Sequence, residues 1–177
     1  MLFRSSIINM KSEDVQFSNV AMAELRVLMT AVNDILEMTA DAYKEKSHSM
    51  AQRIEPLEEV IDELVDKVRR RHMWRMKHNL CEVVRGISFQ NIIQNLERIS
   101  DQCSDLGVNI LGLEDESING NEHQYLRDIH HSDDPLYNRL FAKYKAKYMG
   151  VLDSIAVDSV NGNEEEVEKQ LKLDIEI

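Results

Sequence analysis

Residues that interrupt helices are scarce in this sequence, which contains six glycines and two prolines among its 177 positions. A turn-dense β fold needs more of both, so their scarcity indicates long helices. Aromatic residues are also few, at 6%, and methionine, isoleucine and leucine supply the core material instead. A chain of this length buries one hydrophobic core, so we expect a single domain with tails.

Cysteine and long apolar runs are nearly absent as well. Cys81 and Cys103 are too few for a disulfide framework, and we expect both to be reduced and in or near the core, as in a cytosolic protein. No run approaches the ~20 apolar residues of a membrane-spanning helix. The apolar run in the first ten residues is too short for a secretory signal. We therefore predict a cytoplasmic chain.

The sequence also lacks an excess of positive charge, with 32 Asp and Glu against 21 Lys and Arg and a net charge of −11. Nucleic-acid binding requires a concentrated basic patch, so no nucleic-acid partner is expected. A negative surface of this kind attracts cations instead.

Apolar residues recur at helical spacing in three long segments. The first follows a capping residue, Ser18 or Asn19. The segments are residues 19–46, 47–79 and 87–113. Because the connections between them are short, we predict an all-α fold in which they pack antiparallel, as a three-helix bundle over residues 19–113.

The remaining residues divide into four parts. Residues 1–18 show weak periodicity and form a lead-in segment. The Asn, Gly and Ser content of residues 114–134 predicts a loop. An additional C-terminal helix is predicted for residues 135–154, beginning at a proline, and residues 155–177 form an acidic tail.

Each helix of the predicted bundle carries an acid followed four positions later by aspartate. The pairs are Glu37 with Asp41, Glu58 with Asp62, and Glu97 with Asp101, and Asp105 follows the last of them. An i,i+4 pair lies on one helix face. Successive residues of a helix are rotated by about 100°. On this basis the second pair and the third pair each lie beside the apolar stripe of their own helix, on the same side of it. These two pairs can therefore meet in a groove beside the interface of their helices.

Two such pairs form a candidate metal site, because like charges repel and a shared cation relieves the repulsion. Oxygen-rich ligands suit iron, manganese, magnesium or calcium. The alternative is a set of solvated acids without any ion, since acidic i,i+4 pairs are common on exposed helix faces. Nearby bases such as Arg53 and Arg98 would then neutralise some of them.

The third helix also carries a family signature. Its run Asn95-Leu-Glu-Arg-Ile-Ser-Asp101 resembles the LERI-x-D-H motif of PhoU-type helical domains, and Glu58-x-x-x-Asp62-x-Leu64 resembles the companion motif on the preceding helix. The order of residues from Arg71 to Arg98 is similar to the PhoU-like region that follows the membrane part of bacterial sodium/phosphate cotransporters. Residues 125–148 resemble the tail of such chains.

This resemblance implies a regulatory, metal-binding domain associated with sodium-dependent phosphate transport rather than an enzyme. It implies metal ligands at Glu58, Asp62, Glu97 and Asp101, with iron, manganese or zinc as the ion. The second choices as ligands are Glu37, Asp41 and Asp105. The implied partner is a membrane transporter domain or another phosphate-regulation protein, at the inner face of the cell membrane, and a homodimer is left open.

The sequence departs from the family pattern at two positions of the third helix. Gln102 stands where the motif usually has histidine, and Asp105 where asparagine is usual. One three-helix repeat is present, whereas the family's proteins usually carry two.

Two other functions are compatible with the sequence. Glu45-x-x-His48 is the motif of carboxylate di-iron enzymes, which require it on two helices together with further inward-facing glutamates. A purely structural helical adaptor, whose acidic pairs bind no metal, is the other alternative.

A basic segment, residues 67–78, ends the second predicted helix and contains Trp74. We interpret it as a solvated last turn whose cations complement the helix dipole. The alternative is a contact with anionic lipid head groups or with the acidic surface of a partner, in which Trp74 serves as an anchor.

Overall fold

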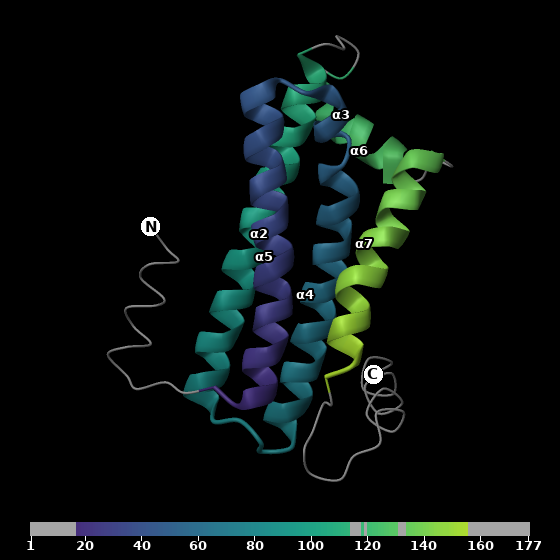
Figure 1. Ribbon diagram of the computed structural model, residues 1–177. Coiled ribbons are helices and arrows are strands. Elements are labelled where there is room, and N and C mark those ends of the chain that lie inside the picture. Colours follow the sequence, from purple (N-terminus) through teal and green to yellow (C-terminus); the bar gives the residue numbers. More distant parts are fainter. Residues whose placement is uncertain (1–16, 114–117, 119, 131–133, 156–177) are drawn as a thin grey trace.

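Three long antiparallel helices form the body of the molecule, α2 (Asn19–Glu45), α4 (Ile54–Lys77) and α5 (Val83–Gly112) (Figure 1). The computed structural model describes residues 17–113, 118, 120–130 and 134–155. No strand occurs among these residues. The predicted fold class, an all-α bundle with an additional C-terminal helix, is confirmed. None of the helices described is sufficiently long and apolar to cross a membrane.

Local capping determines where α2 begins and ends. The Ser18 hydroxyl accepts a hydrogen bond from the backbone N–H of Ala21 at 3.2 Å, which satisfies one of the free donors of the first turn. At the other end Lys46 adopts a left-handed conformation with φ of 48°. Such a residue terminates a helix because its backbone N–H turns back onto the last carbonyls.

The second predicted helix is interrupted near its start. The structure divides it into a single turn, α3 (His48–Ala51), and the long helix α4. Pro56 is the third residue of α4, where its missing N–H costs no intrahelical hydrogen bond. The next helix, α5, begins at Val83, four residues before the predicted start.

The predicted loop over residues 114–134 contains a helix, α6 (Glu122–His130), so this prediction was wrong over that range. Tyr125 and Leu126 pack against the core, and this packing stabilises the helix. The flanking Asn and Gly residues favour a loop, so the sequence alone did not predict a helix here. The lead-in segment up to residue 16 and the acidic tail beyond Ile155 lie outside the described residues.

The C-terminal helix α7 (Pro135–Asp153) lies along α4 and also contacts α2 (Figure 1). Asp134 caps it, accepting hydrogen bonds from the N–H groups of Leu136 and Tyr137 at 2.7 and 2.9 Å. Its buried side chains are aromatic except for the last. They are Tyr137, Tyr144, Tyr148 and Leu152.

A buried ion cluster joins α2, α4 and the end of α7. Glu24 is fully buried, and Arg75 binds both of its oxygens, at 2.9 and 2.6 Å. Arg71 lies 3.6 Å from the same carboxylate and donates to the backbone carbonyls of Leu152 and Ile155, both at 3.0 Å. Two arginines of the basic segment are therefore buried and paired, contrary to our interpretation of that segment as wholly solvated.

Candidate metal centre

Three carboxylates from two helices meet beside the interface of α4 and α5. Glu58 and Asp62 lie one turn apart on α4, and Asp101 comes from α5. One oxygen from each lies within 4.8 Å of the other two. The positions on the helical wheel predicted that the second and third acid pairs meet, and three of their four carboxylates come together here.

The three side chains differ in their exposure to solvent. Glu58 is buried, with 8% of its surface exposed, whereas Asp62 is half-buried and Asp101 is exposed. The Oδ1 atom of Asp62 is buried and has no hydrogen-bond partner among the described residues. A buried acceptor without a donor is costly, so this oxygen requires a proton, a water molecule or a cation.

Burial and mutual repulsion raise the pKa of all three carboxyls. Burial, followed by the charges of Asp62, Glu55, Asp101 and Glu59, raises the pKa of Glu58 to about 9. The pKa of Asp62 rises to about 6 because of burial and then the charges of Asp101 and Glu97. In the absence of a cation, Glu58 therefore holds a proton at neutral pH.

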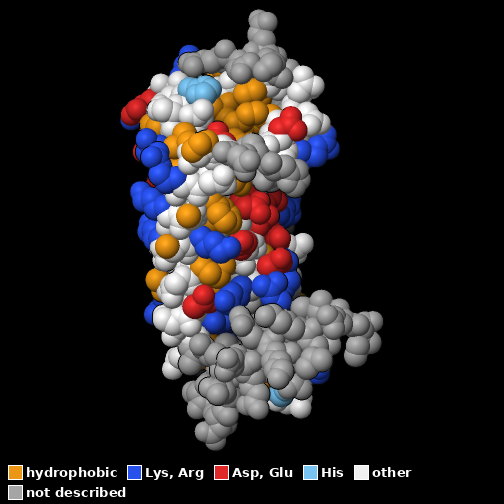
Figure 2. All heavy atoms as spheres, turned by 90° about the vertical axis from the view of Figure 1, so that its right-hand side faces the viewer, with side chains coloured by type: hydrophobic (Ala, Val, Ile, Leu, Met, Phe, Trp, Pro, Cys, Tyr) orange, Lys and Arg blue, Asp and Glu red, His pale blue; other side chains and the backbone are white. Residues whose placement is uncertain are grey.

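The pKa of Asp101 is raised for related reasons. Burial is the largest, followed by the charges of Glu97 and Asp105, while the nearby Arg98 opposes the shift. The face of the molecule shown in Figure 2 has acidic side chains gathered at mid-height and basic side chains below them. Negative charge is thus concentrated locally rather than spread evenly over the surface.

The donor set and its spacing fit a metal ion. Carboxylate ligands of zinc lie about 2.0–2.2 Å from the ion and those of calcium about 2.3–2.6 Å. Oxygens bound to one ion are therefore at most about 4–5 Å apart. The 4.8 Å limit found here is at the upper end of that range, so small side-chain rotations suffice to bring all three oxygens onto one ion.

Glu97, which the resemblance also implied as a ligand, is placed differently. Its Oε2 accepts a hydrogen bond from Arg69 of α4 at 2.8 Å, and the same guanidinium contacts Asp66 at 3.2 Å. Glu97 is therefore neutralised by a base, while its charge still acts on Asp62. It lies beside the three carboxylates without forming part of them.

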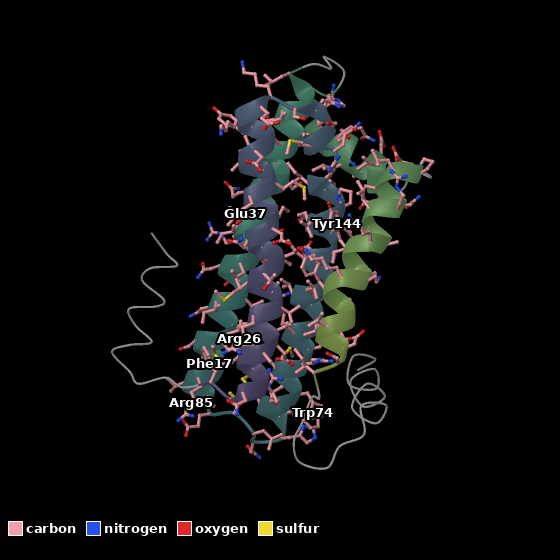
Figure 3. The ribbon with its side chains drawn as sticks, viewed as in Figure 1. Phe17, Arg26, Glu37, Trp74, Arg85 and Tyr144 are labelled. Atoms are coloured by element: carbon pink, nitrogen blue, oxygen red, sulfur yellow. The ribbon has the colours of Figure 1, made fainter. Side chains whose placement is uncertain are left out.

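None of the three second-choice residues belongs to the cluster. Glu37 and Asp41 line a pocket between α2, α4 and α7 that Tyr144 also lines, and Figure 3 labels Glu37 and Tyr144 on these elements. Glu37 accepts a hydrogen bond from Asn33 at 2.8 Å. Asp105 lies one turn beyond Asp101 and accepts from Gln102 at 3.4 Å.

The structure adds neighbours that the sequence analysis did not identify. Tyr137 of α7 is buried, and burial followed by the charges of Glu59, Glu55, Glu58 and Glu63 raises the pKa of its hydroxyl. No local signal could have identified this tyrosine, because its position depends on how α7 docks against α4.

Two serines of α5 also lie near these acids. The Ser104 hydroxyl donates to Glu55 in a buried hydrogen bond, whereas the buried Ser100 hydroxyl has no partner among the described residues. Ser104 contacts α4 through this bond, and both serines lie within one turn of Asp101 on α5. They show that the interface of α4 and α5 is polar well beyond the predicted pairs.

Comparison with known protein families gives one match. Residues 25–110 match the family described as the PhoU domain, a range that includes α3, α4 and all three carboxylates of the cluster. No curated protein and no solved structure matches the chain.

Proposed function

From the premise that residues 25–110 form a PhoU domain, we propose that this chain binds a metal ion through Glu58, Asp62 and Asp101 and uses it in regulating phosphate transport. The PhoU family has a regulatory, non-enzymatic role in phosphate transport. The metal and its ligands are the part of this function that we propose.

One observation carries the proposal. Three carboxylates converge within 4.8 Å, and the neighbours that dominate their pKa values are other acids. The buried Glu24, by contrast, is matched by an opposite charge, that of Arg75. Like charges without a matching base destabilise a fold, and a bound cation converts that repulsion into attraction.

The three ligands would have distinct roles. Glu58 and Asp62 would hold the ion against α4, and Asp101 would connect it to α5. The bound ion supplies positive charge that binds the two helices together. Iron, manganese and zinc are the candidate ions, since all of them accept carboxylate ligands.

The resemblance to the domain that follows sodium/phosphate cotransporters suggests where this regulation acts. We propose a partner of that class, a membrane transporter domain or another phosphate-regulation protein, at the inner face of the cell membrane. Homodimer formation would be compatible with this function, although it is not required by the metal site.

The alternative of a di-iron enzyme is not favoured by the observed geometry. Glu45 is the last residue of α2 and His48 is the first of α3, with the left-handed Lys46 between them. The two side chains therefore do not project one turn apart from a single helix, as that motif requires.

The proposal is tested by elemental analysis of protein purified without chelators or metal-affinity columns. We expect a stoichiometric amount of iron, manganese or zinc in the wild type and its loss in Glu58→Gln/Asp62→Asn. The matched control is Glu37→Gln/Asp41→Asn, which removes an acid pair of the same spacing at another pocket and should retain the metal.

Two outcomes would contradict the proposal. Folded protein that remains empty after incubation with each ion would favour the structural adaptor. Loss of metal in the control variant alone would show that the ion binds in the pocket between α2, α4 and α7 instead.

A further inference from the structure

The turn between α4 and α5, together with the adjoining helix ends, forms one end of the bundle (Figure 1). We call residues 70–87 the hairpin tip. Large hydrophobic side chains are exposed along it: Met73, Met76, Leu80, Val83, Val84 and Ile87. Val83 is 72% exposed, although the rest of its helix buries its apolar face. Single exposed apolar residues are normal, but six of them within one short segment at an end of the bundle favour a contact surface.

The charge around the hairpin tip is opposite to that of the chain as a whole. Residues 70–87 contain five lysines and arginines and one acid, Glu82, whereas the chain carries a net charge of −11. Arg71 and Arg75 form ion pairs with Glu24 inside the bundle. Arg70 and Lys77 are exposed, so basic groups flank the exposed apolar side chains.

The single tryptophan of the chain belongs to the same region. Trp74 is half-buried and stacks on His78 with ring centroids 4.2 Å apart. Figure 3 shows Trp74 and Arg85 at the same end of the bundle. Tryptophan is enriched at the boundary between lipid and water, because its ring is apolar and its N–H is polar.

From these features we infer that the hairpin tip docks onto an anionic lipid bilayer. Aliphatic side chains at the end of the helices would enter the boundary between head groups and acyl chains, and Arg70 and Lys77 would contact the lipid phosphates. The tip is the protruding end of a long bundle, and such an end fits a planar, deformable surface. An acidic protein partner, by contrast, would need a concave surface to cover it.

This inference does not depend on the metal site. The α4 residues of the tip lie 12 to 19 positions beyond Glu58, which corresponds to roughly 18–28 Å of helix. Variants at the tip should therefore leave metal content unchanged, so failure of one proposal is distinguishable from failure of the other.

Vesicle binding by the full chain tests the inference. We expect the wild type to co-sediment with phosphatidylcholine vesicles that contain phosphatidylglycerol, and less with pure phosphatidylcholine or at high salt. Because Trp74 is the only tryptophan, its emission should shift to shorter wavelength on binding and be quenched by lipids with brominated chains.

The variant Val83→Ser/Ile87→Ser removes two exposed apolar side chains and should weaken vesicle binding by about tenfold or more. Arg70→Gln/Lys77→Gln should reduce binding to the anionic vesicles alone. The matched control is Leu113→Ser/Val151→Ser, which replaces side chains of similar exposure, 73% and 52%, outside the tip. Equal thermal unfolding would show that each variant is folded.

Three results would overturn the inference. The first is a wild type that binds no anionic vesicles at low salt. The second is binding that the tip variants and the control weaken equally. The third is tip-dependent binding to an acidic protein without vesicle binding, which would assign the surface to a protein partner.

Discussion

At the scale of single residues, the buried acids Glu24 and Glu58 lie in different electrostatic environments. Glu24 receives two hydrogen bonds from Arg75, so its charge is compensated inside the fold. Glu58 is almost as deeply buried, but its pKa of about 9 arises from burial and other carboxylates. Ionised Glu58 therefore destabilises the metal-free fold, whereas Glu24, bound to Arg75, is part of its core.

The raised pKa of Glu58 has a definite consequence for stability. Its pKa is about 9 in the folded chain and 4.5 as a model value, so the folded state binds more protons between these limits. The free energy of unfolding of the metal-free protein should therefore fall as pH rises through this window, by up to ~1.4 kcal/mol per pH unit from this group.

Glu58→Gln should remove that loss, because glutamine is neutral in both states. We expect the metal-free variant to be more stable than the wild type near pH 8, by up to ~5 kcal/mol for 3.5 pH units at ~1.4 kcal/mol each, and by much less near pH 4.5. Urea unfolding in the presence of a chelator measures this difference. Glu63→Gln is the control, since Glu63 is paired with Lys145 at 2.7 Å and should show no such gain. A pH-independent difference would show that Glu58 ionises without penalty.

At the scale of helices, close approach of backbones positions the candidate site. Gly107 of α5 lies against Ile54, the buried first residue of α4. A Cβ atom at position 107 would lie 3.0 Å from Ile54 Cδ1 and 3.3 Å from its Cβ and Cγ2. Glycine thus allows α4 to begin close to α5, and this contact helps to determine which α4 carboxylates reach Asp101.

Replacing two helical glycines should have opposite effects. In Gly107→Ala the crowding against Ile54 should outweigh the better helix propensity of alanine and cost about 1 kcal/mol. Gly150 of α7 is exposed, and a Cβ there would have no heavy atom within 4 Å. Gly150→Ala should therefore stabilise the protein by about 0.5–1 kcal/mol. Thermal unfolding measures both changes. Stabilisation by both substitutions would show that the Ile54 side chain moves aside for the added Cβ atom at little cost in free energy.

At the scale of the whole molecule, the middle of the bundle and its hairpin tip carry different charges. The acids that meet at the candidate metal centre lie along α4 and α5, while the hairpin tip contains five lysines and arginines and one acid. The net charge of −11 is therefore unevenly distributed: the middle of the bundle attracts cations, and the hairpin tip attracts anions. Metal binding and lipid docking would use these two regions separately.

Metal binding should stabilise the whole chain, and more so at higher pH. A ligand at about 100 times its Kd adds about 2.7 kcal/mol to the free energy of unfolding. Because the ion must displace the proton of Glu58, its affinity should rise about tenfold per pH unit between the pKa of Asp62, about 6, and that of Glu58, about 9.

Thermal unfolding with and without manganese(II) at several pH values tests this coupling. The shift in Tm should grow with pH in the wild type and be lost in Glu58→Gln. Potassium chloride at matched ionic strength is the control for screening. A Tm shift that is the same at every pH would contradict proton displacement from the cluster.

Much of the architecture was predictable because its causes are local in the chain. Helical periodicity identified α2, α4, α5 and α7, and side-chain chemistry limited the cap of α2 to Ser18 or Asn19, of which Ser18 is the cap. The i,i+4 spacing placed each acid pair on one helix face, since that relation needs only the geometry of a helix. The prediction missed α6 because the flanking Asn and Gly residues favour a loop, whereas packing against residues far away in the chain favours the helix.

Tertiary structure decided which acids act together, because that choice depends on the rotation and docking of whole helices. It brought Glu58 and Asp62 to Asp101, whereas Arg69, from the same helix as the first two, neutralised Glu97. It also buried Arg71 and Arg75 against Glu24 while leaving Val83 exposed. Residues of one chemical kind thus acquired different environments through contacts between residues far apart in the chain, which spacing along a single helix cannot encode.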